Sequence, residues 1–117
     1  MESFTKVHAN WLSGVVYLIG QHLTPVVNTI KSKTHGNNSV CVIGSKGDFD
    51  EIMVNVTVNV EPKQVYGCVR ISTDKYTIRD GVSIGLNDDP QILATNIERK
   101  ANELFGYLSK NPDNYRI

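Results

Sequence analysis

Two arginines on neighbouring predicted strands are the residues best suited to bind an anion. Arg70 and Arg79 lie four to five residues on either side of a tight-turn signal, so we expect them to be same-face neighbours in a β-hairpin. Like charges placed opposite each other destabilise a sheet, which favours an anionic partner: Asp80, a neighbouring chain or a bound phosphate. Two solvated arginines are the simpler alternative. Tyr66 and Tyr76 could stack on a base, although strand tyrosines more commonly pack against cross-strand neighbours.

A second candidate is the segment from Leu86 to Pro90, between the last predicted strand and the last predicted helix. A turn followed by a helix cap explains both of its aspartates without a ligand. In the functional alternative, Asn87 binds the edge of a base and Asp89 binds ribose hydroxyls. A carboxylate at a helix start would repel a phosphate, so phosphate binding falls to arginine. The candidate ligand-binding residues are therefore Arg70, Arg79, Tyr76, Leu86, Asn87 and Asp89.

Motifs for catalysis are missing from the sequence. There is no glycine-rich phosphate loop, no G-x-S-x-G and no H-E-x-x-H. His8, His22 and His35 lie far apart, and His22 falls on an apolar helix stripe, which is typical of a hydrogen-bonded core or interface residue. Pairing of Cys68 with a histidine is disfavoured because the cysteine lies in mid-strand. We expect no catalytic residue, no metal, no cofactor and no enzymatic activity.

Length and charge limit the possible functions further. A chain of 117 residues has room for one domain, residues 1–117, with residues 111–117 expected to form a flexible tail. It is 40% hydrophobic and 21% charged, which is typical of a folded soluble protein. Twelve basic side chains balance twelve acidic ones. The long-range positive field of a general nucleic-acid binder is therefore missing, and no nucleic-acid polymer is expected as a partner.

The two cysteines and the apolar runs indicate a cellular compartment. Cys41 and Cys68 lie inside predicted strands and are expected to be buried free thiols, because two cysteines make neither a disulfide framework nor a zinc site. Without a leader sequence, they predict a reducing cytoplasm. The apolar run from Gly14 to Gly20 is too short to span a membrane, so no membrane partner is expected.

The sequence predicts a helix in the N-terminal third of the chain. From Phe4 to about Ser32, apolar residues recur at three- and four-residue steps in two adjacent stripes. Pro25 either kinks this helix or begins a second one capped by Thr24, and residues 31–38 read as a loop. The wide apolar arc, which includes Trp11 and Tyr17, favours a homo-oligomer through this helix. The alternative is that the final helix packs on the second stripe.

Four strands and a helix follow. Alternation with a period of two predicts strands over residues 39–44, 52–60, 64–72 and 76–86, with a bulge or break at residues 79–81. Asp89 and Pro90 start the final helix. The prediction is an α+β domain of order α-β-β-β-β-α: a four-stranded antiparallel meander with both helices on its valine-rich face. The other face is polar and open to water.

This plan resembles that of small phage proteins that defeat the Thoeris defence system by sequestering its cyclic ADP-ribose signal. The resemblance covers the long N-terminal helix, the antiparallel meander, the C-terminal helix and the local stretch Leu86-Asn87-Asp88-Asp89. In that family a loop with an apolar or aromatic residue, then asparagine and aspartate, helps to line the ligand pocket. Leu86 stands here where an aromatic residue would be expected to stack.

The resemblance implies a function. It implies a phage-type protein that binds a cyclic nucleotide between subunits in the cytoplasm of an infected bacterium and does not cleave it. An alternative from a different class is a small protein–protein inhibitor or adaptor that grips a host protein through its exposed sheet face or an edge strand. A small enzyme acting on a nucleotide is a third, less favoured possibility.

Overall fold

The chain folds into one antiparallel sheet with a helix at each end of the sequence. The computed structural model describes the backbone of residues 4–117 and the side chains of residues 11–117. Its elements are α1 (Phe4–Leu23), β1 (Asn28–His35), β2 (Ser39–Lys46), β3 (Phe49–Val60), β4 (Gln64–Ser72), β5 (Thr77–Gly85), α2 (Pro90–Lys110) and the 3-10 helix η1 (Pro112–Tyr115).

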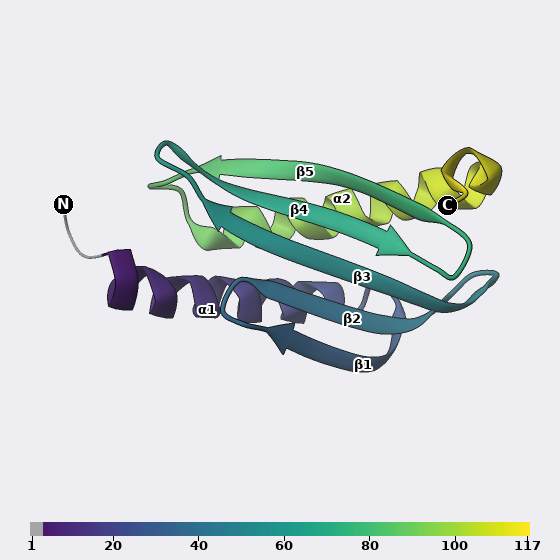
Figure 1. The fold of residues 1–117 in the computed structure, drawn as a ribbon, viewed down its shortest axis with the longest axis horizontal. Coiled ribbons are helices and arrows are strands. Elements are labelled where there is room, and N and C mark those ends of the chain that lie inside the picture. Colours follow the sequence, from purple (N-terminus) through teal and green to yellow (C-terminus); the bar gives the residue numbers. More distant parts are fainter. Residues whose placement is uncertain (1–3) are drawn as a thin grey trace.

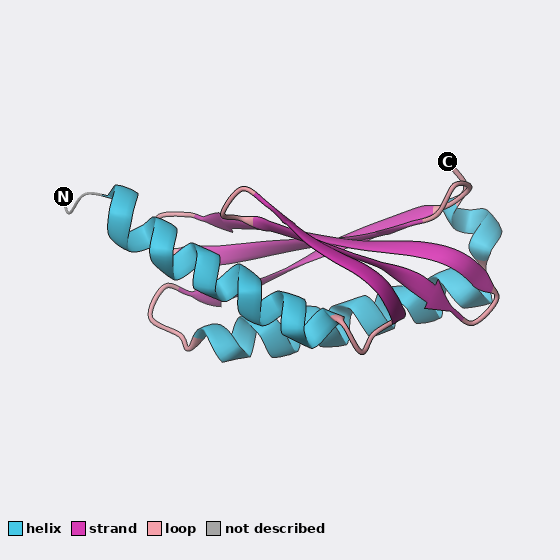
Figure 2. Cartoon of the chain, turned by 90° about the horizontal axis from the view of Figure 1, so that it is seen from below, coloured by secondary structure: helices cyan, strands magenta, loops and turns pink. Residues whose placement is uncertain are grey.

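All neighbouring strands pair antiparallel, in the order β1-β2-β3-β4-β5. Both helices lie on one face of the sheet and the other face is uncovered (Figures 1 and 2). The predicted α+β class, the meander and the one-sided helices are therefore confirmed. The sheet has five strands rather than four. None of the helices in the described part of the chain has the length and apolar character needed to cross a membrane.

The extra strand is β1, where the sequence predicted the end of a helix and a loop. Helix α1 ends at Leu23, nine residues earlier than expected, because the Thr24 hydroxyl bonds to the Gln21 carbonyl and Pro25 cannot continue the helical hydrogen bonds. Val26 and Val27 then pack into the core beside the helix. Their burial extends the apolar spacing of α1, which is why the helical pattern ran past the true end of the helix.

Valines from the middle strands make the core face of the sheet. The predicted alternation of β3 is confirmed, with Ile52, Val54, Val56 and Val58 all at most 1% exposed. The α2 side chains that cover this face are Leu93, Ala94, Ile97, Ala101, Leu104 and Leu108. Helix α2 packs on β4 and β5 of this face. At about 25 cal/mol per Å2 of buried apolar surface, this contact is a main source of folding free energy.

Helix α1 packs against both the sheet and α2, which accounts for its wide apolar arc. Leu12, Val16 and Ile19 are buried, as is Val15 on the adjoining stripe. Between the helices, His22 Nδ1 lies 2.8 Å from Glu98 Oε1, so the predicted hydrogen-bonded role of His22 is confirmed. Within a single chain, α2 therefore packs on the second apolar stripe of α1, as the alternative interpretation of the sequence expected. Self-association through α1 stays a prediction.

The bulge predicted at residues 79–81 is wrong, because β4 and β5 pair without a register shift.

The C-terminal segment lies against the turn before β5. Beyond α2, the chain forms η1, and the amide of Ile117 bonds to the carbonyl of Lys75 at 2.9 Å. The flexibility expected for residues 111–117 stays a prediction.

The contact between α2 and the sheet predicts a large difference between two isoleucines of the same helix. Ile97 is fully buried against the sheet, whereas Ile92 is 47% exposed. Replacing Ile97 with alanine should lower the free energy of unfolding by about 2–5 kcal/mol, because it leaves a cavity. Ile92→Ala should change it by less than about 1 kcal/mol. Urea unfolding of both variants measures this, and equal losses would contradict the packing described.

Candidate anion-binding face

The uncovered face of the sheet carries a row of basic side chains across its strands. Paired residues of an antiparallel sheet lie on the same face. The cross-strand pairs therefore form one row on the open face, in the order Lys33, Cys41, Asn55, Arg70 and Arg79. At about 4.8 Å between strands, this row is about 19 Å long. Three of its five residues are basic and none is acidic.

Arg70 and Arg79 form the centre of this charge. They are direct cross-strand partners and both are exposed, so the predicted same-face pairing is confirmed. Among the described residues, no carboxylate forms an ion pair with either guanidinium. The pair is thus a site of concentrated positive charge, of the kind that binds phosphate or carboxylate.

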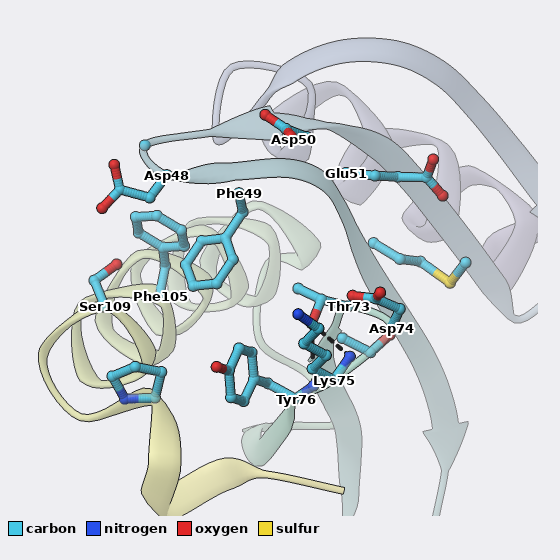
Figure 3. Close-up of a pocket in the computed structure, with 14 residues that line it drawn as sticks. Asp48, Phe49, Asp50, Glu51, Thr73, Asp74, Lys75, Tyr76, Phe105 and Ser109 are labelled. Carbon is cyan, nitrogen blue, oxygen red and sulfur yellow. Dashed lines mark hydrogen bonds between the residues drawn. The ribbon is translucent and has the colours of Figure 1, made fainter.

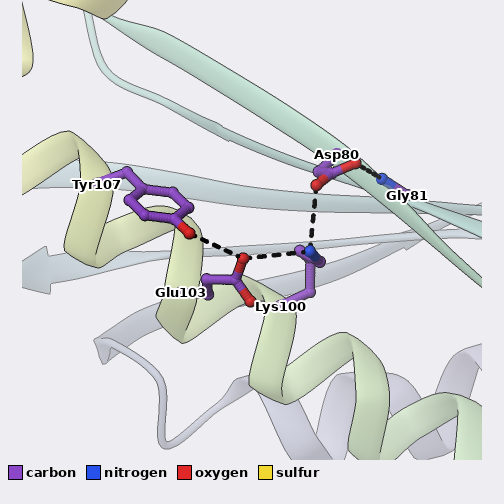
Figure 4. A network of polar contacts seen from close by, with 5 residues as sticks. All are labelled: Asp80, Gly81, Lys100, Glu103 and Tyr107. Carbon is purple, nitrogen blue, oxygen red and sulfur yellow. Dashed lines mark hydrogen bonds and ion pairs between the residues drawn. The ribbon is translucent and has the colours of Figure 1, made fainter.

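Asp80, one of the three anions considered from the sequence, does not serve this pair. It is the cross-strand partner of the buried Val69 and therefore belongs to the face that α2 covers. Its Oδ2 accepts from Lys100 Nζ at 3.1 Å, and Lys100 in turn lies 3.4 Å from Glu103 (Figure 4). The Gly81 amide and then Lys100 hold the pKa of Asp80 below its usual value. Alternation along β5 therefore separates Asp80 from its neighbour Arg79.

Cys41 lies in the same row and is nevertheless buried, with 5% of its surface exposed. Burial raises the pKa of its thiol, and the positive charge of Arg70 offsets part of that rise. Cys41 and Cys68 are both free, as predicted, but Cys68 is only half-buried on the open face.

An aromatic ring also lies on this face. Tyr66 is on the same side of β4 as Arg70, four residues and about 13 Å away along the strand. Its ring crosses β5 at Gly81, since a Cβ on that glycine would meet the Tyr66 hydroxyl at 1.9 Å. The role of Gly81 is therefore to make room for the tyrosine ring on the open face, not to bulge the strand.

The remaining predicted site residues lie elsewhere. Leu86, Asn87 and Asp89 are together and exposed in the turn after β5. Tyr76 lies before β5, at the opposite end of a nine-residue strand that is about 30 Å long. Tyr76 packs there against Phe49, with ring centroids 6.2 Å apart. The six candidates therefore form one arginine pair, one turn and one separate tyrosine, rather than a single pocket.

Hydrogen bonds explain the aspartates of the turn. Asp88 Oδ2 accepts from the Gly85 amide at 2.8 Å, and Asp89 Oδ1 accepts from the Gln91 amide at 2.9 Å. Asp89 is the N-cap of α2. The alternative of a turn followed by a cap is therefore confirmed for both side chains, and a ligand at this turn has no structural observation in its favour.

Sequence reasoning missed the basic residues of β1. Lys31, Lys33 and His35 pair with Ile43, Cys41 and Ser39 and so lie on the open face. The sequence prediction assigned them to a helix end and a loop, so it did not indicate that their side chains lie on the same face of a strand. The alternation of these three residues with Ser32 and Thr34 is a period-two signal that could have indicated a strand.

The structure assembles no metal site from the side chains of residues 11–117: no group of three or more histidine, cysteine, aspartate or glutamate residues could hold an ion there. His35 is exposed at the end of β1, and His8 lies outside the described side chains. Comparisons of this chain with protein-family models, with curated proteins and with solved structures find no match.

The unpaired arginines predict an effect on stability without any ligand. Arg79→Gln should raise the free energy of unfolding by about 0.2–1 kcal/mol at low salt, because it removes repulsion from Arg70. The gain should shrink as salt screens the charges. Urea unfolding at low and high ionic strength measures it, with the exposed Arg99→Gln on α2 as the control. A loss of stability in Arg79→Gln would show that the pair already has an anionic partner within the chain.

The lowered pKa of Asp80 predicts acid sensitivity. A carboxyl group whose pKa falls on folding adds stability above its unfolded pKa near 3.9, and that stability is lost as the pH falls through the folded value. Asp80→Asn should therefore be less stable than the wild type at pH 6, and the difference should disappear at pH 2. Thermal unfolding between these values measures it, with Asp50→Asn as the exposed control. A difference that persists at pH 2 would contradict the electrostatic explanation.

Proposed function

We propose that this chain is a non-catalytic binding protein that sequesters a small phosphate-bearing nucleotide on the open face of its sheet. The observation that carries the proposal is the direct pairing of Arg70 with Arg79, in a row with Lys33, on a face that no helix covers. An electrically neutral chain that concentrates unpaired cations in one row is suited to bind a compact anion, not a long polyanion.

The spacing of groups on this face favours a nucleotide over inorganic phosphate. The Tyr66 Cα lies about 13 Å along β4 from that of Arg70, and its ring extends over Gly81, two residues from Arg79 on β5. A base stacked on that ring would leave its phosphates free to reach the two guanidinium groups. Asn55, which lies between Arg70 and Cys41, adds the N–H donors of its amide for sugar hydroxyls, while its Oδ1 accepts from Ser39 Oγ at 3.3 Å.

The more specific proposal concerns the ligand and the setting. On the resemblance of the overall plan, the nucleotide would be of the cyclic ADP-ribose type, held and not cleaved, in the cytoplasm of an infected bacterium. An uncovered sheet face leaves a ligand accessible to water on one side. Tight sequestration would therefore need a second copy of the chain to cover the open face. That contact differs from the self-association expected through α1, which lies on the other face of the sheet.

A protein–protein inhibitor or adaptor is the second candidate. It is favoured by one observation: β1 is a sheet edge on which all eight residues are exposed. An exposed edge can pair with a strand of another protein. The two candidates differ in their need for the arginine pair, which a partner bound to the β1 edge would not contact.

Thermal unfolding with cyclic ADP-ribose isomers tests the proposal. A ligand at a hundred times its dissociation constant adds about 2.7 kcal/mol to the free energy of unfolding, so the midpoint should rise by several degrees. Arg70→Ala and Arg79→Ala should each weaken binding about tenfold or more while the fold is kept. Arg99→Ala, which removes an exposed arginine from α2, is the control.

Three further measurements separate the alternatives. Mass spectrometry of ligand released by heat should recover it unchanged, since a cleaved ligand would indicate an enzyme. Asn87→Ala should leave affinity unchanged if the ligand lies on the open face, and a loss would move the site to the turn after β5. Unchanged affinity in the double variant of Arg70 and Arg79 would contradict the proposal.

A further inference from the structure

A large cleft opens at the end of the sheet, away from the basic row. It has a volume of about 1050 Å3 and lies between the start of β3, the turn from β4 to β5 and the end of α2 (Figure 3). Pockets for small molecules are typically about 300–1,000 Å3. The cleft therefore has room for a ligand as large as a short peptide segment.

The cleft exists because β3 is longer than its pairing with β4. Strand β3 begins at Phe49, but its pairing with β4 begins only at Met53, opposite Ser72. Beyond Ser72 the chain turns away, closed by a hydrogen bond from the Thr73 amide to the Tyr76 carbonyl at 2.9 Å. The first four residues of β3 therefore have β2 on one side and the open cleft on the other. Their free edge can pair with another strand.

Charge in the cleft is strongly acidic. Four carboxylates line it: Asp48, Asp50, Glu51 and Asp74. Lys75 is the one basic residue in the lining. Among the described residues none of the four carboxylates forms an ion pair. Glu51 from β3 and Asp74 from the turn come from opposite sides of the cleft (Figure 3), so a cation between them would have a carboxylate on each side.

Aromatic rings form one wall of the cleft. Phe49 meets Tyr76 and Phe105 edge to face, with centroids 6.2 Å and 5.8 Å apart. Lys46 already lies over the Phe105 ring, with Nζ 5.1 Å from its centroid. Ring faces of this kind attract ammonium and guanidinium groups and pack against their alkyl stems.

We propose that this cleft binds an extended basic peptide segment of a partner protein. The peptide backbone pairs with the free edge of β3 at residues 49–52. Its lysine or arginine side chains lie between Glu51 and Asp74, and their alkyl stems pack toward the wall formed by Phe49 and Tyr76. The strand edge supplies affinity, and the carboxylates select a basic sequence over a neutral one. This site is separate from the basic row on the open face, so either proposal can fail without the other.

Fluorescence anisotropy with blocked, labelled hexapeptides tests the proposal on the full chain. The basic probe alternates valine with arginine, and the neutral probe alternates valine with glutamine. The basic probe should bind, and the double variant Glu51→Gln with Asp74→Asn should weaken it about tenfold. Glu61→Gln is the matched control, and it should leave the affinity unchanged because Glu61 lies at the opposite end of β3. The fold is kept there because a glutamine still accepts a hydrogen bond from Gln64.

Two further probes test the strand edge. A basic peptide with alternate backbone amides methylated should lose most of its affinity, because it cannot complete a ladder of hydrogen bonds. Free spermidine should compete only weakly, since it offers charge without a backbone. Equal binding of the neutral or methylated peptide, full competition by spermidine, no binding of the basic probe, or no effect of the double variant would each overturn the proposal.

Discussion

Burial of the valine face of the sheet under two helices is the contact on which the rest of this structure depends. Helix α2 packs on β4 and β5, and α1 completes the layer by packing on β2 and on α2. Both helices cover the same face of the sheet. With α1 and α2 both on the other side, the open face can carry polar and charged side chains without a desolvation cost (Figure 2).

That division of faces also separates the charges. The chain is neutral overall, with twelve basic and twelve acidic side chains, yet one row of the open face holds three cations and no carboxylate. Acidic residues gather at the end of the sheet, where β3 extends past β4, and on the helical side, where Asp80 pairs with Lys100. A zero net charge therefore hides two local fields of opposite sign, and these suit two different kinds of ligand.

The sequence predicts an element of this fold well when the pattern that indicates it lies in neighbouring residues. The alternation of β3 and the aspartate cap of α2 depend on neighbouring residues, and both were predicted. The pairing of Arg70 with Arg79 was predicted because a short turn sets the register of one hairpin. Strand β1 is polar on both sides and packs little of its surface, so it lacks the apolar alternation that marks a buried strand. Lys33 and the end cleft were missed because both depend on register between strands, which composition does not reveal.

The most direct test of the account is a backbone-amide NMR titration of the full chain with cyclic ADP-ribose. The account predicts shifts that saturate and that centre on Arg70, Arg79 and Asn55, with smaller changes at Cys41, which is the cross-strand partner of Asn55. Shifts confined to residues 86–89, or a spectrum unchanged at millimolar ligand, would contradict the claim that the uncovered face of the sheet is the binding surface.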